Sequence, residues 1–293
     1  MQSTIVKVVF GSLIRVQRYL PWMMTALIVI LVFVLRSVIK YRRKVISVNL
    51  FNSFGGEMSK DQIDQLTYNY YDVLGRYVRE ILHLQGLSKS QISDVIYLKN
   101  VKEIMATLDQ KSIILMASHY GNWEVNMVAL PALLSRRVIG FYKPISSDAM
   151  HEVMTAMRSK FGLELYPIEQ TVRKMAELKN EKIVYIFISD QTPVNMNGVY
   201  WATFLHQMTP WVTGAGKLGK RFAYPIYYMH QTPIKRGHWY DLSFSEITSR
   251  KDIMSETDIM DSYIRYLSDE IAADPVQWLW SHKRWKRAHL YEG

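Results

Sequence analysis

The chain contains no cysteine among its 293 residues. Disulfides, thiolate metal sites, iron–sulfur clusters and a covalent thioester on the protein are therefore excluded. Near the C-terminus, His282 and His289 are separated by basic residues and lack a third partner at metal-ligand spacing, so no metal site is expected. No internal repeat, low-complexity tract or clear linker divides the sequence.

The chain has fewer acidic than basic residues: 26 Asp and Glu against 36 Lys and Arg. Its formal net charge is therefore +10. Nucleic acid, an anionic membrane surface or an acidic protein could each explain this excess. The sequence lacks zinc-finger spacing and the aromatic-glycine pattern of RNA-binding modules, so no nucleic acid partner is expected. Because the cations cluster beside apolar and aromatic stretches, a membrane surface or an acidic carrier is favoured, with a basic but soluble surface as the alternative.

An apolar run without charge, YLPWMMTALIVILVFVL, extends over the 17 residues from Tyr19 to Leu35. This length is at the short limit for crossing about 30 Å of hydrocarbon. Pro21 suits a helix start, and Trp22 suits the membrane interface. No small-residue cleavage site follows, which argues against a signal peptide. The run predicts either a short tilted spanning helix or a helix in one leaflet; a buried core helix is the alternative.

A basic cluster follows this run: Arg36, Lys40, Arg42, Arg43 and Lys44. Its density favours a cytoplasmic location for the rest of the chain, although the preceding flank is basic too. We expect residues 1–45 to form an N-terminal membrane segment, within which the apolar residues 5–14 are a second candidate membrane contact. Residues 46–293 are expected to form a single domain.

The remaining sequence alternates short apolar runs with helical stretches, and this pattern predicts an α/β fold. Strands are expected at 112–117, 138–142, 163–168, 183–189 and 224–229, and helices at 60–84, near 122–135, 146–161, 169–179 and 211–221, and at 256–273. Ser59 is expected to cap the first of these helices, and Asp274-Pro275 to end the last. The alternating residues 240–244 predict a strand that Lys235-Arg236-Gly237 turns back on its predecessor. The predicted sheet is mixed, mostly parallel and flanked by helices, after the N-terminal membrane-associated helix.

The segment Ser118-His119-Tyr120-Gly121-Asn122-Trp123-Glu124 follows directly on an apolar strand. Asn122 is a good N-cap for the helix that comes next. In one continuous helix His119 and Glu124 would lie about 140° apart around the axis, too far to pair reliably. At a strand–turn–helix corner the two side chains can face each other, at the carboxyl edge of the sheet where open α/β folds place their sites.

An ionised Glu124 in the first helical turn would hold the imidazole of His119 in one tautomer and stabilise its protonated form. The pair then forms a base without a nucleophile of its own. Such a base suits direct transfer, in which His119 deprotonates a hydroxyl that attacks an activated acyl group.

The HYGNWE string resembles the active-site signature of the bacterial lipid A late (secondary) acyltransferases, which are similar to the glycerolipid acyltransferases. The resemblance covers roughly residues 40–288. It includes these further pieces: Tyr41-Arg42-Arg43 with Asn49-Leu50, Tyr142-Lys143-Pro144, Arg158 with Gly162, Ser189-Asp190-Gln191, Thr213-Gly214, and the closing segment Pro275 to Lys286 (PVQWLWSHKRWK). Lys143 replaces the usual arginine and keeps its charge but not its two-pronged geometry. The segments 192–194 and 204–207 also depart from the family pattern, which leaves the acceptor open.

The resemblance implies a glycerolipid-acyltransferase-like fold, catalysis by His119 and Glu124, and substrate contacts from Asn122, Trp123, Tyr142, Lys143, Arg158, Asp190 and Gln191. Lys143 and Arg158 would contact phosphopantetheine or acceptor phosphate groups. For Asp190 and Gln191, a structural role in holding loops is the alternative. Trp22, Arg42, Arg43, Arg284, Trp285 and Lys286 are expected to contact lipid.

The leading hypothesis is a membrane-associated O-acyltransferase that needs no cofactor. It would move a fatty acyl chain from acyl carrier protein to a hydroxyl of a lipid A precursor, on the cytoplasmic side of the bacterial inner membrane. A second reading is acylation of another membrane lipid, such as an aminolipid or a phosphatidylinositol mannoside, with coenzyme A as possible donor. A third is a catalytically silent membrane-associated binding protein, against which the intact His119 and Glu124 argue.

Overall fold

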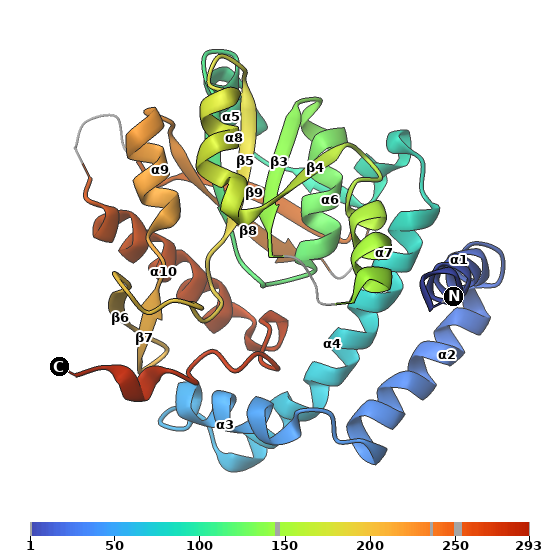
Figure 1. Ribbon diagram of the computed structural model, residues 1–293. Coiled ribbons are helices and arrows are strands. Elements are labelled where there is room, and N and C mark those ends of the chain that lie inside the picture. The colour runs from blue at the N-terminus through green and yellow to red at the C-terminus, as the bar shows by residue number, and fades with distance from the viewer. Residues whose placement is uncertain (1, 144–146, 235–236, 249–253, 293) are drawn as a thin grey trace.

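The computed structural model describes residues 2–143, 147–234, 237–248 and 254–292, which form a sheet covered by helices (Figure 1). Within these residues, the main sheet has seven strands in the order β1-β9-β8-β2-β5-β3-β4. They are β1 (Ile96–Leu98), β2 (Ile113–Ala117), β3 (Arg137–Tyr142), β4 (Leu163–Pro167), β5 (Ile183–Ile188), β8 (Ile226–Pro233) and β9 (Tyr240–Glu246). Neighbours run parallel except β8 and β9, which pair antiparallel. The expected mixed, mostly parallel α/β sheet is confirmed.

The central strand β2 reads as a continuous apolar run because both faces of the sheet are covered, and it is buried at every position. One face packs against α5 (Val101–Leu108) and α6 (Trp123–Leu134). The other face packs against α8 (Thr171–Glu177), α9 (Gly214–Phe222) and α10 (Glu256–Ala273). The carboxyl end of β2 therefore lies in the middle of the sheet edge, with β5 and β8 on either side.

The long helix α4 (Lys60–Gly86) begins as its capping sequence predicts. The hydroxyl of Ser59 accepts from the backbone of Gln62, and the side chain of Gln62 accepts from the backbone of Ser59 at 2.7 Å. Figure 1 shows α4 crossing the lower half of the molecule, with α3 (Arg43–Phe54) near its start and α7 (Asp148–Arg158) near its end.

A two-stranded hairpin, β6 (Tyr200–Phe204) with β7 (Gln207–Trp211), was not expected from the sequence. The predicted helix from 211 begins only at Gly214. The predicted β8–β9 hairpin is confirmed by its antiparallel pairing, although residues 235 and 236 of the expected turn lie outside the described residues.

The N-terminal apolar run forms α2 (Pro21–Phe33), which follows α1 (Gln2–Tyr19) and ends in the π-helical turn η1 (Val34–Val38). Of the helices in the described part of the chain, Pro21–Val38 is the one that is long and apolar enough to cross a membrane. Its mean hydropathy is 2.1, and only 11% of it is buried. Figure 1 shows α1 and α2 at one side of the molecule, next to α4.

Candidate active site

The motif of the site occupies the sharp corner between β2 and α6. Gly121 turns the chain with a φ of +61°, a conformation that residues with a side chain rarely adopt. Asn122 then caps α6 by accepting from the backbone N–H of Val125. The corner thus carries His119 to the carboxyl edge of the sheet, as the sequence predicts.

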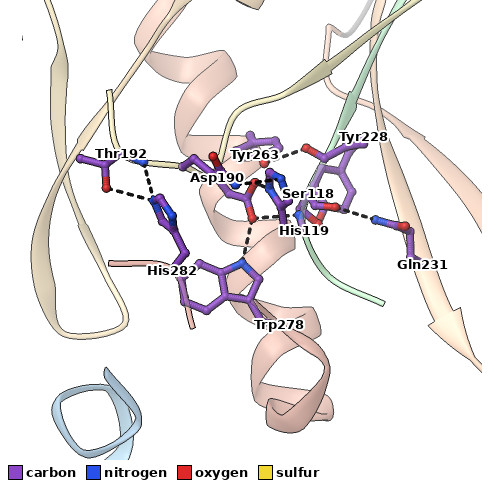
Figure 2. A network of polar contacts seen from close by, with 11 residues as sticks. Ser118, His119, Asp190, Thr192, Tyr228, Gln231, Tyr263, Trp278 and His282 are labelled. Carbon is purple, nitrogen blue, oxygen red and sulfur yellow. Dashed lines mark hydrogen bonds and ion pairs between the residues drawn. The ribbon is translucent and has the colours of Figure 1, made fainter. Parts of the chain in front are cut away.

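His119 is held by a buried carboxylate at the end of the neighbouring strand β5 (Figure 2). Its Nδ1 lies 2.6 Å from Oδ1 of Asp190, and its backbone N–H donates to Oδ2 at 2.9 Å. Trp278 Nε1 donates to the same Oδ2 at 2.8 Å. On the other side of the ring, the side-chain nitrogen of Gln191 lies 3.0 Å from Nε2.

These contacts set the charge of the carboxyl group. Burial of Asp190 opposes its ionisation, but attraction to His119 and the hydrogen bonds from His119 and Trp278 outweigh this, so the pKa of Asp190 lies below its ordinary value. An ionised carboxylate can only accept hydrogen bonds. The proton on His119 therefore sits on Nδ1, which leaves a lone pair on Nε2 to accept from Gln191.

The expected pairing of His119 with Glu124 is corrected by this geometry. Within the described residues, Glu124 makes its hydrogen bonds to Arg158 instead. Arg158 Nε donates to Oε2 at 2.8 Å, and its Nη2 donates to the other oxygen. The guanidinium at the end of α7 offers two parallel donors that match the carboxylate, which the single ring nitrogen of a histidine cannot.

Beside His119 opens a cavity of about 740 Å³. Its deeper wall is apolar and includes Met127, Leu163 and Ile186. The predicted site residues that line it are His119, Trp123, Glu124, Tyr142, Lys143, Arg158 and Gln191. The ring of Trp123 packs edge-on against that of His119, with 4.9 Å between centroids. The structure therefore brings together the histidine, one ion pair, one further cation and an apolar space in a single pocket.

Two predicted substrate contacts prove to be buried. Asn122 and Asp190 are each 1% exposed, and their polar atoms bond to protein groups. Both residues therefore hold the motif in place through hydrogen bonds and do not line the cavity. Their predicted role as substrate contacts is corrected.

Several residues that hold the corner were not singled out from the sequence. Glu80 of α4 is buried, and it accepts from Asn122 Nδ2 at 2.9 Å and from the Tyr240 hydroxyl at 2.8 Å. Burial raises the pKa of Glu80, against the effect of these two hydrogen bonds. On the other side, Gln231 donates to the backbone oxygen of Ser118 at 3.1 Å (Figure 2). A carboxylate within the apolar face of α4 was the one available signal for Glu80.

The C-terminal motif packs inward more than expected. Arg284 is fully buried, donates to the Pro210 oxygen at 2.8 Å and stacks over the Trp211 ring, so its predicted lipid contact is wrong. Trp285 is half-buried and donates to Thr209. Arg42 donates to the Ser281 oxygen at 2.8 Å. The exposed members of the predicted lipid-contact set are Trp22, Arg42, Arg43 and Lys286.

Among the described residues, no group of three or more His, Asp or Glu side chains could hold a metal ion. The features that remain are a histidine fixed by a buried aspartate and, beside it, a cavity of about 740 Å³ with apolar residues in its wall. Together they fit an acyl-group transferase of the α/β class.

Comparison with known proteins agrees with this class. The sequence model of the bacterial lipid A biosynthesis acyltransferases matches residues 9–287, and the chain belongs to this family. It is therefore an acyltransferase, with an acyl donor and a lipid acceptor as substrates. No curated protein matches the chain at a significant level.

Proposed function

We propose that the protein transfers a fatty acyl chain from acyl carrier protein to a hydroxyl group of a lipid A precursor, with His119 as general base. The observation that carries this proposal is the fixed imidazole: Asp190 holds Nδ1 of His119, and His119 lines a cavity with an apolar wall. In this proposal residues 46–293 perform the chemistry, and residues 1–45 attach the enzyme to the cytoplasmic face of the inner membrane.

The reaction would proceed by direct transfer. His119 Nε2 takes the proton of the acceptor hydroxyl as its oxygen attacks the thioester carbonyl, and the C–S bond breaks after the tetrahedral intermediate forms. The departing sulfur takes a proton from the imidazolium. Asp190 stabilises the imidazolium in between, since an ionised carboxylate lies beside Nδ1. Gln191 would leave Nε2 when the acceptor enters.

The cavity supports a long-chain thioester as donor. Its apolar wall can accept the acyl chain, and the exposed Lys143 can contact the phosphate of the phosphopantetheine arm. Because 36 basic residues outnumber 26 acidic ones, the protein is suited to bind an acidic carrier protein that holds the phosphopantetheine arm. Coenzyme A carries the same arm and is the alternative donor.

The Glu124–Arg158 ion pair is proposed to act at the mouth of the cavity. Both side chains line it, and the side chain of Arg158 is 21% exposed. Glu124 would hold the guanidinium ready for a phosphate group on a substrate, while Tyr142 and Trp123 close the space around His119.

The test is His119→Ala in the purified enzyme with acyl carrier protein thioester and lipid A precursor. Loss of a general base is expected to lower kcat by about 10²–10⁴-fold. Transfer at a near wild-type rate would exclude the mechanism. Mass spectrometry of lipids from a deletion strain identifies the acceptor: loss of one chain from lipid A agrees with the proposal, whereas unchanged lipid A with an altered aminolipid or mannoside would overturn it.

A further inference from the structure

The two chain segments that flank the apolar helix α2 both contact the rest of the protein. Before it, Lys7 on α1 forms an ion pair of 2.7 Å with Glu152 on α7. The side-chain nitrogen of Gln17, also on α1, lies 3.4 Å from Nδ1 of His83 on α4. After it, Asn49 on α3 donates to the backbone oxygens of Trp280 and His282, each at 2.9 Å. A helix that crossed a bilayer would separate such segments by about 30 Å of hydrocarbon.

One side of α2 is packed tightly against α4. Met24 and Val32 are buried at 1% and 6% exposure. At Gly75 of α4 the two helices approach so closely that an added Cβ would overlap Val32 and lie 3.1 Å from Ile28 Cγ2. Just beyond, Arg36 contacts both carboxylate oxygens of Asp72 at 3.2 Å.

The α4 surface beneath α2 carries the charged residues Asp72, Arg76 and Arg79, which line a small cavity between the two helices. Charged side chains are costly in the hydrocarbon centre of a membrane. α4 therefore cannot accompany α2 across a bilayer, and a spanning α2 would have to leave α4 and lose the packing at Gly75.

The chain also turns sharply after η1, the continuation of α2. Lys40 and Arg42 both adopt positive φ, at 52° and 50°, and bring the chain into α3. Left-handed backbone at two residues with side chains persists only where the surroundings fix it. Here Arg42 is fixed by its hydrogen bond to Ser281.

The outward side of α2 is apolar and has no protein partner among the described residues. Trp22, Ile30 and Leu27 are exposed at 70%, 59% and 43%. Exposed cations flank the helix in the sequence on both sides: Arg15, Arg18, Lys40, Arg43 and Lys44. An apolar strip bordered by cations matches an anionic lipid leaflet, in which the strip enters the acyl region and the cations meet the headgroups.

We infer that α2 lies in one leaflet of an anionic membrane and does not cross it. In this arrangement α1, α3 and the rest of the chain after α3 all lie on the same side of the membrane. This inference rests on the membrane attachment proposed above and decides between the two forms that the sequence leaves open. An in-plane position also agrees with the short length of α2, since a helix that lies in one leaflet need not match the full thickness of the hydrocarbon.

The absence of cysteine from the sequence makes the test direct. Lys7→Cys/Glu152→Cys and, independently, Gln17→Cys/His83→Cys are expressed as full chains, and their membrane fractions are treated with a bis-maleimide whose spacer is much shorter than a bilayer. Each single substitution serves as the matched control. We expect both pairs to give an internal cross-link by peptide mass spectrometry, absent from every single variant.

The outcomes separate the two proposals. If the chain sediments with membranes but neither pair cross-links, or if Lys7→Cys reacts with an impermeant maleimide from the periplasmic face of spheroplasts, α2 spans the membrane and the inference is overturned. Membrane attachment would stand in that case. If the chain is recovered entirely in the soluble fraction, membrane attachment fails, and the inference fails with it.

Discussion

His282 lies beside the site and makes the folded protein sensitive to acid. Its Nε2 accepts from the backbone N–H of Thr192 at 3.2 Å (Figure 2). Burial, followed by repulsion from His119, lowers the pKa of His282 from 6.5 to about 4. Below pH 6.5 the unfolded chain binds a proton here that the folded chain does not, so this residue makes stability fall as pH decreases from 6.5 toward 4.

The variant His282→Gln is therefore expected to flatten this part of the stability profile. Chemical denaturation at pH 5 and pH 7 measures it: the difference in free energy of unfolding between the two should be smaller in the variant than in the wild type. His289→Gln, at an exposed position, is the control and should leave the difference unchanged. An unchanged difference in His282→Gln would show that His282 is not the responsible group.

Among the elements, β3 and β4 form part of the cavity wall, and Gly140 leaves space in it. Gly140 of β3 lines the cavity together with Leu163 and Leu165 of β4. A Cβ added at Gly140 would lie 3.3 Å from Leu165 Cδ2 and 4.0 Å from Leu163 Cδ1. A side chain at this position would therefore fill space that the end of an acyl chain could occupy.

Gly140→Ala and Gly140→Val are expected to shift donor preference toward shorter acyl chains, with valine giving the larger shift. One methylene in an apolar pocket corresponds to about 10–200-fold in kcat/KM, so the ratio between long and short donors should fall by at least about tenfold in Gly140→Val. Gly86→Ala, where no atom lies near the added Cβ, is the matched control. A uniform loss across all donor lengths would show that the acyl chain does not end at this wall.

The elements themselves differed in how readily the sequence predicted them. β2, β3, β4 and β5 were found from their apolar runs because a parallel sheet covered on both faces needs such runs. The β6–β7 hairpin was missed because its turn lacks the usual glycine or asparagine: Leu205 and His206 adopt φ of 48° and 64° without either. Packing of Phe204 against Trp211, Trp278 and Trp285 holds this hairpin in place, and such contacts are not visible in local sequence.

At the scale of the whole molecule, the site joins segments that are far apart in the sequence. The position of His119 at a strand–turn–helix corner followed from the sequence, because a buried strand, a glycine and an N-cap are local signals. Its partner did not, since Asp190 follows the end of another strand, 71 residues away, and Glu124 was nearer in sequence. Local reasoning thus placed His119 at the sheet edge but paired it with Glu124, whereas the structure pairs it with Asp190.

The +10 charge is also a property of the whole chain, and burial decides which cations are available to a partner. Arg284 is enclosed in the core, whereas Arg43 and Lys286 remain exposed. The sequence could identify the basic, aromatic C-terminal motif but could not separate its inward-facing cations from its outward-facing ones.

In the proposed mechanism Asp190 acts through His119, and measuring kcat of His119→Ala, Asp190→Asn and the double variant tests this coupling. Each single change is expected to lower kcat by about 10²–10⁴-fold, and the double variant should lose no more than His119→Ala alone, because the aspartate has no function without the imidazole. Unchanged thermal unfolding of Asp190→Asn would show that the loss is not one of folding. A double variant whose loss equals the product of the two single losses, or an Asp190→Asn variant with near wild-type kcat, would show that Asp190 does not act through His119.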